Sequence, residues 1–301
     1  MSKLNFRKPT LDDIDNIMRA LKYVKHNACD YTPTNIIMWV DEYNTEIAFD
    51  DSDLYIKYNI DGMIFFGVPF VMSGIGKGIE NLIKYTEDND IELAIGDVEP
   101  EIFAIIDRIY PGQFKVNYQR DGADYVYNIK DMAELSGKKY HGKKNHINKF
   151  KKTYDNWCYE KMSDDNADEC IDMVKEWCVK NVCADDESKA DEICIMINSI
   201  KNREKLGLIG GLIRANDRVV AVTLGGAIND EMFDINFEKA FADIPGAYPM
   251  INQQFIINEL MDYKYVNREE DMGLDGLRKA KESYLPEFMV QKGLVTFKDA
   301  K

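Results

Sequence analysis

The stretch LIGGLIRANDRVVAVTLGGAINDEMFDINFEKAFADIPGAYP, residues 208–249, decides the fold. It holds three runs rich in apolar and β-branched residues, which are 208–214, 219–228 and 231–238. An Asn-Asp pair lies at each junction, and such pairs are typical of tight turns. The stretch therefore predicts an antiparallel meander of three strands. The loop 244–249 follows and opens a helix that runs to about residue 261.

The same order of elements occurs in the first half of the chain. Each half predicts a strand, a capped helix, a second helix, a meander, a glycine-containing loop, a helix, a strand, a helix and a closing strand pair. In the first half the loop is Ser73-Gly74-Ile75-Gly76-Lys77-Gly78, and the closing strands are 114–118 and 124–129. Nine elements in one order predict two domains of one plan. We expect an N-terminal domain over 1–130, a lysine-rich helical linker over 131–156 and a C-terminal domain over 157–301.

Composition narrows the class of protein. A length of 301 residues with 45% hydrophobic residues provides for two packed cores. No apolar run reaches the roughly 20 residues that a membrane helix needs, and the start lacks the apolar stretch of a signal peptide. We therefore expect a cytoplasmic protein without membrane insertion. The six cysteines form no C-x-x-C pair and only three histidines are present, so no metal site is expected.

Charge is distributed unevenly along the chain. The formal net charge is −15, which disfavours general nucleic-acid binding. Residues 138–152 are the exception, because they hold seven lysines and no acid. These lysines either form a patch for a polyanion or offset the acids of 164–176 and 185–192, and the sequence leaves both possibilities open.

Three stretches carry a resemblance to a known family. They are KKYHGKKNHINKF (138–150), NREEDMG (267–273) and LRKAKESYLP (277–286). They resemble the C-terminal domains of bacterial phosphatidylglycerol lysyltransferases, which are related to Fem-type aminoacyltransferases. In the lysine-rich K-x-K-[FY]-x-P stretch of that family, Lys281, Tyr284 and Pro286 match, whereas Ser283 stands in place of the second lysine.

The resemblance implies a fold and a type of reaction. The fold is two tandem N-acetyltransferase-type (GNAT) units of α/β (α+β) class, with mixed, mostly antiparallel sheets flanked by helices. The reaction is transfer of an acyl group from acyl-CoA, or from an aminoacyl-tRNA, to an amine or hydroxyl. Coenzyme A or acyl-CoA is thus the expected co-substrate, and tRNA is a possible partner. Ser283 makes a lysyl-tRNA donor the less favoured of the two.

Candidate site residues follow from the resemblance and from residue chemistry. The loop of Pro245, Gly246, Ala247 and Tyr248 matches the place where the fold holds donor phosphates on a helix N-terminus; the loop 74–78 is the second choice. Asp271 is the candidate base or orienting acid, Lys281 the candidate for stabilising an oxyanion, and Tyr284 the candidate proton donor. The expected substrate contacts are Asn236, Glu238, Asn267, Arg268, Glu269 and Arg278.

Each of these residues has an ordinary structural interpretation as well. The acids around residue 270 can form a solvated turn, the arginines can merely pair with them, and Lys281 can be a surface lysine beside a half-buried tyrosine. A protein of another class also fits the sequence, namely a non-catalytic CoA- or RNA-binding protein that keeps the tandem fold. The polar cluster over 267–284 favours the enzyme.

Overall fold

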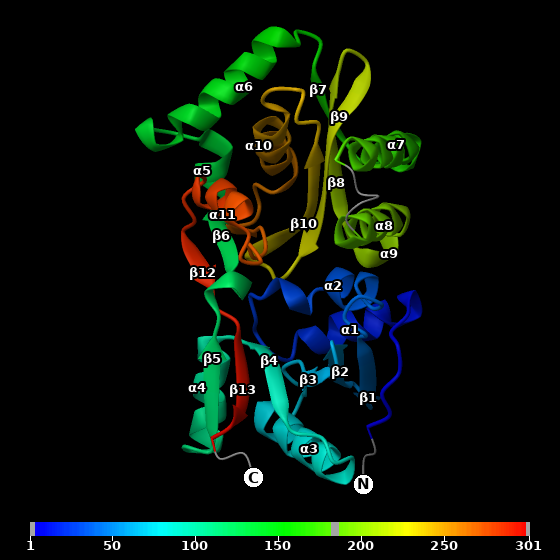
Figure 1. Cartoon of the computed structure of the whole chain (residues 1–301), viewed down its shortest axis with the longest axis vertical. Coiled ribbons are helices and arrows are strands. Elements are labelled where there is room, and N and C mark those ends of the chain that lie inside the picture. The colour runs from blue at the N-terminus through cyan, green and yellow to red at the C-terminus, as the bar shows by residue number, and fades with distance from the viewer. Residues whose placement is uncertain (1–3, 182–186, 299–301) are drawn as a thin grey trace. The chain divides into compact units, whose positions relative to one another are not determined.

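A computed structural model describes residues 4–181 and 187–298. The chain divides into two compact units, neither of which is one continuous segment. Unit 1 consists of Met1–Asp124, Glu270–Asp275 and Met289–Lys301, and unit 2 consists of Tyr125–Glu269 and Gly276–Phe288. Figure 1 shows the elements of both units along the chain.

Unit 1 is built around a six-stranded sheet with the order β1-β2-β3-β4-β13-β5. Its strands are β1 (Glu46–Asp50), β2 (Asp53–Ile60), β3 (Met63–Phe66), β4 (Ala94–Val98), β5 (Phe114–Tyr118) and β13 (Gly293–Phe297). All neighbours are antiparallel except β3 and β4, which are parallel. Its α-helices are α1 (Ile14–Leu21), α2 (Pro33–Met38), α3 (Ile75–Asp88) and α4 (Pro100–Ile109).

Unit 2 is built around a seven-stranded sheet with the order β12-β6-β11-β10-β9-β8-β7. Its strands are β6 (Asp124–Asn128), β7 (Cys158–Lys161), β8 (Ile209–Ala215), β9 (Arg218–Ala227), β10 (Met232–Ala240), β11 (Tyr265–Asn267) and β12 (Phe288–Val290). The helices are α5 (Ile129–Glu134), α6 (His141–Thr153), α7 (Asp164–Lys180), α8 (Glu187–Lys201), α9 (Arg203–Leu206), α10 (Ala247–Glu259) and α11 (Asp275–Glu282).

The two sheets share one topology. In each, an antiparallel meander is followed by a parallel strand, which is β4 in unit 1 and β11 in unit 2. In each, a further strand pairs antiparallel with that parallel strand and lies between it and the last strand of the sheet. The expected fold class, two tandem GNAT-like units with mixed sheets flanked by helices, is therefore confirmed.

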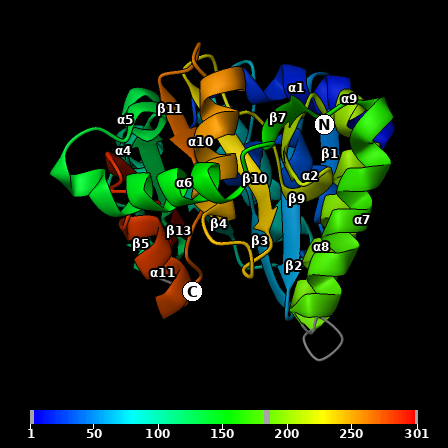
Figure 2. The same ribbon diagram turned by 90° about the horizontal axis from the view of Figure 1, so that it is seen from above.

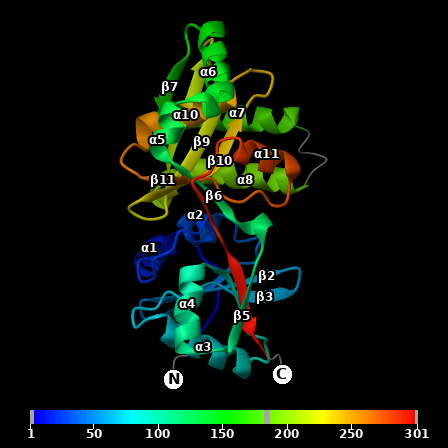
Figure 3. The same cartoon turned by 90° about the vertical axis from the view of Figure 1, so that its left-hand side faces the viewer.

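The inserted strands are exchanged between the two halves of the sequence. β6 follows β5 in the chain but lies between β11 and β12 in the sheet of unit 2, whereas β13 lies between β4 and β5 in unit 1. Figure 3 shows β13, in red, beside β5. The contiguous domains expected over 1–130 and 157–301 therefore differ from the observed units. The closing strand pairs expected in each half also differ, because β5 pairs with β13 and not with β6.

The segment 131–156 is not a separate linker in the structure. Its helices α5 and α6 belong to unit 2, where both pack against α10. The Gln253 side chain on α10 donates a hydrogen bond to the carbonyl of Ala133 on α5, at 2.8 Å. Figure 2 shows α6 lying across α10. These helices are thus part of the unit that follows them.

Burial of β9, an interior strand of the unit 2 sheet, explains its composition. All residues of β9 between its two ends are buried, because α10 contacts the strand and α7 contacts it as well. A strand that is covered on both faces reads as a continuous apolar run rather than as an alternation, which is the pattern over 219–226. Among the described residues, no helix is long and apolar enough to cross a lipid bilayer.

Gly246 marks the contact between α6 and the beginning of α10. Its φ is +92°, and a Cβ at this position would lie 2.5 Å from the backbone oxygen of His146 on α6. Only glycine adopts this conformation readily, and only a residue without a side chain lets the two backbones approach so closely. Gly246 is therefore required by the packing of α6 on α10.

We expect Gly246→Ala to lower the free energy of unfolding by about 2 kcal/mol, because it combines an unfavourable backbone conformation with a collision against backbone atoms. Gly142→Ala is the matched control. Gly142 lies on α6, and a Cβ there would have no atom within 4 Å. This variant should be unchanged or gain up to about 1 kcal/mol from helix propensity. Urea denaturation measures both, and equal stability of the two variants would contradict the packing described.

Candidate active site in unit 2

The candidate site begins where two parallel strands part. β11 pairs with β10 over only three residue pairs, from Met232↔Tyr265 to Asp234↔Asn267. β10 continues to Ala240 and has a bulge between Asp234 and Phe237 in its pairing with β9. A Cβ on Gly225 of β9 would collide with the backbone of Asp234, so glycine is needed beside the bulge. Beyond the bulge, Glu238 lies on the sheet face that α10 covers, since it bonds to Asn252 of that helix.

Beyond Asn267, β10 and β11 are no longer paired, and we call the place where they part the fork. Arg268 follows the last residue of β11 and spans this fork. Its Nη2 donates to Oε1 of Glu238 at 2.9 Å, while Asn252 Nδ2 donates to the other carboxylate oxygen at 3.1 Å. Both partners of the ion pair are largely buried, with side chains 16% and 8% exposed. A buried pair whose carboxylate is held from two sides is oriented far more firmly than a surface pair. Glu238 and Asn252 therefore fix the guanidinium of Arg268.

Tyr284 lies beside this ion pair and is contacted by two cations. The Arg268 guanidinium carbon lies 5.3 Å from the centre of the tyrosine ring, and Nζ of Lys143 lies 3.8 Å from it. Tyr127 packs edge-on against the same ring, with the centres 6.4 Å apart. Tyr140 donates a hydrogen bond to the Tyr284 carbonyl at 3.2 Å. The ring is thereby held in one place with positive charge against it.

The surroundings change the acidity of two groups here. Burial, together with the charge of Arg268, lowers the pKa of Lys143 to about 8, although Glu238 acts in the opposite direction. Burial also raises the pKa of Tyr284 well above its usual value. The tyrosine hydroxyl is protonated at neutral pH, as in any tyrosine, and burial strengthens this preference, so it can act as a hydrogen-bond or proton donor. Lys143 loses its charge far more readily than an ordinary lysine.

We call Glu238, Arg268, Asn252, Tyr284 and Lys143 the unit 2 cluster. The side chain of Lys281 binds backbone carbonyl groups and does not face this cluster. Its side chain is buried, and Nζ donates to the carbonyl oxygens of Arg268 at 2.6 Å and Glu269 at 3.1 Å. Both contacts fix the chain at the end of β11. The geometry thus makes Lys281 a positioning residue for Arg268, in contrast to the oxyanion role expected from the sequence.

The other expected substrate contacts lie in and around the same fork. Asn267 is fully buried, and its Oδ1 accepts from the Glu269 N–H at 2.7 Å, which closes a tight turn. Asn236 donates to Asp234 at 2.7 Å and to Glu269 at 3.5 Å. Arg278 is half-buried on α11. Glu238 and Arg268 thus enter the cluster directly, and Asn236, Asn267 and Glu269 shape the turn behind it.

The loop expected to hold phosphate offers few backbone donors. The N–H of Ala247 donates to Ile244 and that of Met250 to Gly246, while Pro249 has no N–H. Pro245 is exposed, and the Tyr248 side chain packs towards Trp177 with its hydroxyl near Ala240. The anion-binding character of a helix N-terminus depends on unpaired N–H groups. Only part of that capacity remains at residues 245–248.

The second glycine loop, in unit 1, borders a pocket of about 610 Å³. Gly74 and Ile75 line it together with Asn27 and Glu99. Glu99 is buried and accepts hydrogen bonds from the backbone N–H groups of Asn27, at 2.6 Å, and Ala28, at 3.2 Å. A carboxylate in the wall is unfavourable for a phosphate ligand.

Asp271 belongs to unit 1, whereas Arg268 and Tyr284 belong to unit 2. It is fully buried, accepts from the Gly273 N–H at 2.9 Å and pairs with Arg120 at 3.3 Å. These contacts stabilise the turn that follows residue 270. The sequence placed Asp271 with Lys281 and Tyr284 because they lie close together in the chain, but the structure assigns them to different units.

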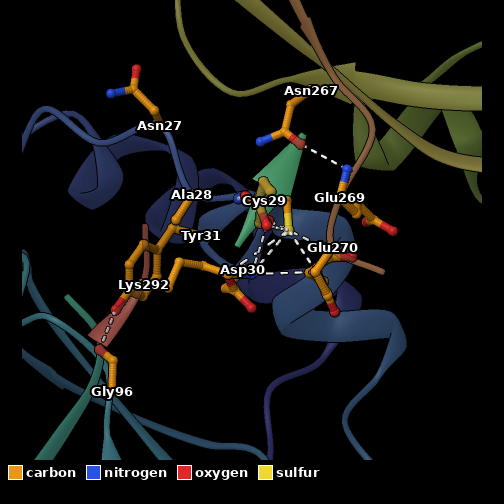
Figure 4. A network of polar contacts seen from close by, with 12 residues as sticks. Asn27, Ala28, Cys29, Asp30, Tyr31, Gly96, Asn267, Glu269, Glu270 and Lys292 are labelled. Atoms are coloured by element: carbon orange, nitrogen blue, oxygen red, sulfur yellow. Dashed lines mark hydrogen bonds and ion pairs between the residues drawn. The ribbon is translucent and has the colours of Figure 1, made fainter. Parts of the chain in front are cut away.

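Unit 1 contains a buried polar cluster of its own, shown in Figure 4. Lys292 Nζ lies 2.7 Å from Asp124, 2.8 Å from Asp30 and 3.3 Å from Glu270. Cys29 Sγ lies 3.4 Å from Asp124. Burial raises the pKa of the Cys29 thiol, and the neighbouring carboxylates raise it further. A protonated, buried thiol is a poor nucleophile, so this cluster is unsuited to covalent catalysis.

Ligand atoms of Cys29, Asp124 and Glu270 lie within 4.8 Å of one another, a spacing that a metal ion could bridge. The ammonium of Lys292 contacts both carboxylates of this set. A metal ion would place positive charge against these buried carboxylates. The ammonium group of Lys292 already provides that positive charge as part of the chain. We interpret this cluster as an internal ion network of unit 1.

Sequence reasoning missed the lysine and the amide side chain of the unit 2 cluster. Lys143 belongs to the basic segment and was grouped with its surface lysines, although it is half-buried against Tyr284. Asn252 is a polar residue on the otherwise apolar buried face of α10. A buried polar residue on such a helix face is the signal that could have identified it.

A family model described as "Phosphatidylglycerol lysyltransferase, C-terminal" matches residues 21–295. No curated protein sequence matches the chain.

The solved structures that are similar to this chain include the following three. A conserved protein of unknown function from Bacteroides thetaiotaomicron is 35% identical, with a TM-score of 0.90 over 98% of this chain and 100% of that one. The C-terminal domain of a putative lysylphosphatidylglycerol synthetase from Agrobacterium fabrum is 12% identical, with a TM-score of 0.64 over 94% and 91%. L-PGS from Bacillus licheniformis is 13% identical, with a TM-score of 0.64 over 95% and 92%. The last two likenesses concern the fold alone.

The contacts of Lys281 predict a structural effect of its removal. Lys281→Met should lower the free energy of unfolding by about 1–3 kcal/mol, because two carbonyl oxygens lose a charged donor. Lys279→Met is the control, since Lys279 lies on the same helix and is exposed. Thermal and urea denaturation test the difference. A Lys281→Met protein as stable as the control would show that Lys281 does not hold the turn.

Proposed function

The chain belongs to the phosphatidylglycerol lysyltransferase C-terminal family, and on this premise we propose that it transfers an acyl or aminoacyl group to an amine or hydroxyl in unit 2. The observation that carries the proposal is the protonated, buried Tyr284 beside an arginine that Glu238 and Asn252 orient. Positioned donors beside fixed positive charge are what acyl transfer requires of an enzyme.

The proposed reaction is a direct transfer. The acceptor's nitrogen or oxygen forms a bond to the acyl carbon, and the bond from that carbon to the donor's sulfur or oxygen breaks. Tyr284 donates its proton to the leaving atom and recovers one from the acceptor, so that the enzyme ends unchanged. Arg268 stabilises the negative charge that develops on the carbonyl oxygen. No covalent intermediate is required.

Burial supports this assignment of roles. A hydroxyl in a dry site transfers its proton to a developing anion more effectively than one in water, because water does not compete for the charge. Tyr284 is only 7% exposed, so little water reaches this side chain. Lys281 contributes indirectly by holding the carbonyls of residues 268 and 269.

Two donors are compatible with the proposal. Acyl-CoA is the proposed donor, and aminoacyl-tRNA is the alternative. Helix α6 supports the alternative, because Lys144, Lys149 and Lys152 are exposed there. Among the ion pairs of the described residues, none joins an α6 lysine to the acids of 164–176.

Removing the tyrosine hydroxyl tests the proposal. Tyr284→Phe should lower turnover by roughly 10²-fold or more, the scale expected for a lost proton donor, while stability changes little. Tyr265→Phe, in the same unit, is the control. Mass spectrometry of the products formed from a panel of acyl-CoA and aminoacyl-tRNA donors with amine acceptors gives the rates. Transfer at the wild-type rate by Tyr284→Phe would reject the site, and a chain that binds donors without any transfer would favour a non-catalytic binding protein.

Salt dependence separates the two donors. Binding of acyl-CoA should change little between about 50 and 200 mM salt, because few charges are neutralised, whereas tRNA binding would fall steeply. Filter binding and calorimetry measure the two slopes. Tight, salt-sensitive tRNA binding that disappears when Lys144, Lys149 and Lys152 are changed to Glu would identify aminoacyl-tRNA as the donor instead. Lys130→Glu, outside α6, is the matched control for the charge change.

A further inference from the structure

Three charged side chains meet at Tyr284, and their charges do not balance. Lys143 and Arg268 both contact the ring of Tyr284, which brings two cations to one buried place. Glu238 is the acid that bonds to Arg268, through one of its oxygens, and its other oxygen is taken by Asn252. For Lys143, the described contacts include the tyrosine ring but no ion pair with a carboxylate. Two cations and one acid leave an excess of one positive charge.

We propose that Lys143 and Arg268 together bind one anionic oxygen group of the substrate, a carboxylate or a phosphate, beside Tyr284. This inference rests on the proposed function and specifies the chemical class of its substrate. The acyl donor or the acceptor then carries an oxyanion next to the atoms that react.

The geometry suits such a group. Arg268 presents a planar fork of donors, of which Glu238 uses Nη2, and guanidinium groups commonly bind carboxylate or phosphate through two parallel hydrogen bonds. Lys143 adds a compact charge from α6, a separate element of the unit. Cations from two elements thus lie against one ring, and each favours an anion in its neighbourhood.

The lowered pKa of Lys143 agrees with an anion site. Burial and the charge of Arg268 lower this pKa to about 8. A bound anion would reverse that effect, because an opposite charge in contact favours the protonated ammonium. By linkage, the anion should therefore bind more tightly below pH 8 than above it, as the charged form of Lys143 is lost when the pH rises through its pKa.

Removing the charge of Glu238 tests whether the affinity for an anion rises or falls. The carboxylate orients Arg268, but it also repels an incoming anion. Glu238→Gln keeps the side-chain length and an oxygen that accepts from Arg268, while it removes the negative charge. The substitution should therefore strengthen anion binding, by roughly tenfold or more, although it removes an ion pair. A role of Glu238 as a catalytic base alone gives no reason for such a gain.

The experiment is an NMR titration of the full chain, labelled with ¹³C at the lysine ε-carbons, with inorganic phosphate and separately with acetate. The resonance that disappears in Lys143→Met identifies Lys143. We expect it to shift saturably with at least one anion, with its pKa moving upward. The stronger of the two anions shows whether the site prefers phosphate or carboxylate chemistry.

Four variants complete the test. Lys143→Met should weaken binding at least tenfold, Lys143→Arg should restore most of it, and Glu238→Gln should tighten it. Lys144→Met, one residue away and exposed, should bind as the wild type does. Unchanged binding in Lys143→Met, or no gain in Glu238→Gln with the chain still folded by circular dichroism, would overturn the proposal. The titration measures anion binding without an acyl donor or turnover. Its outcome can therefore be told apart from the outcome of the transferase experiment.

Discussion

The short pairing of β10 with β11 is the constraint on which the unit 2 cluster depends. Hydrogen bonding between these parallel strands ends at Asn267, whereas β10 continues for six more residues to Ala240. Arg268 therefore leaves the sheet just where Glu238 of β10 has no β11 residue beside it, and the ion pair bridges the fork. The bulge in β10 and the turn held by Lys281 set the two ends of that bridge. Longer pairing would remove the site.

Exchange of the inserted strands explains both the success and the limit of sequence reasoning about the fold. Periodicity and turn residues predict the meander of β8, β9 and β10 because each strand pairs with its neighbour in the chain. The same reasoning predicts that β5 pairs with β6, since a nearby partner is the usual one. The alternation of apolar and polar residues along 114–118 and 124–128 predicts a strand in each case. It does not indicate which strand pairs with it. That choice depends on residues about 180 positions away, at β13.

The candidate site was partly accessible from the sequence for a related reason. Arg268, Tyr284 and Glu238 could be identified, because the first two lie in the family's motifs and Glu238 precedes the loop of the fold. Lys143 could not be separated from six neighbouring lysines, since helical position alone does not show which of them is buried. Asp271 was grouped with Tyr284 by its place in the chain, yet its carboxylate serves Arg120 and a turn in unit 1. Burial and partner, rather than residue type, separate these cases.

The central claim is that the reacting carbonyl is held beside Tyr284 in unit 2. A crystal structure of the chain with an unreactive donor analogue, either a thioether of acyl-CoA or an aminoacyl-adenosine amide, tests it most directly. The account predicts that the analogue's atom in the leaving position lies within hydrogen-bond distance of the Tyr284 hydroxyl, and that its carbonyl oxygen lies beside the guanidinium of Arg268. An analogue bound instead in the unit 1 pocket at Gly74 and Glu99, with the Tyr284 cluster unchanged, would contradict it.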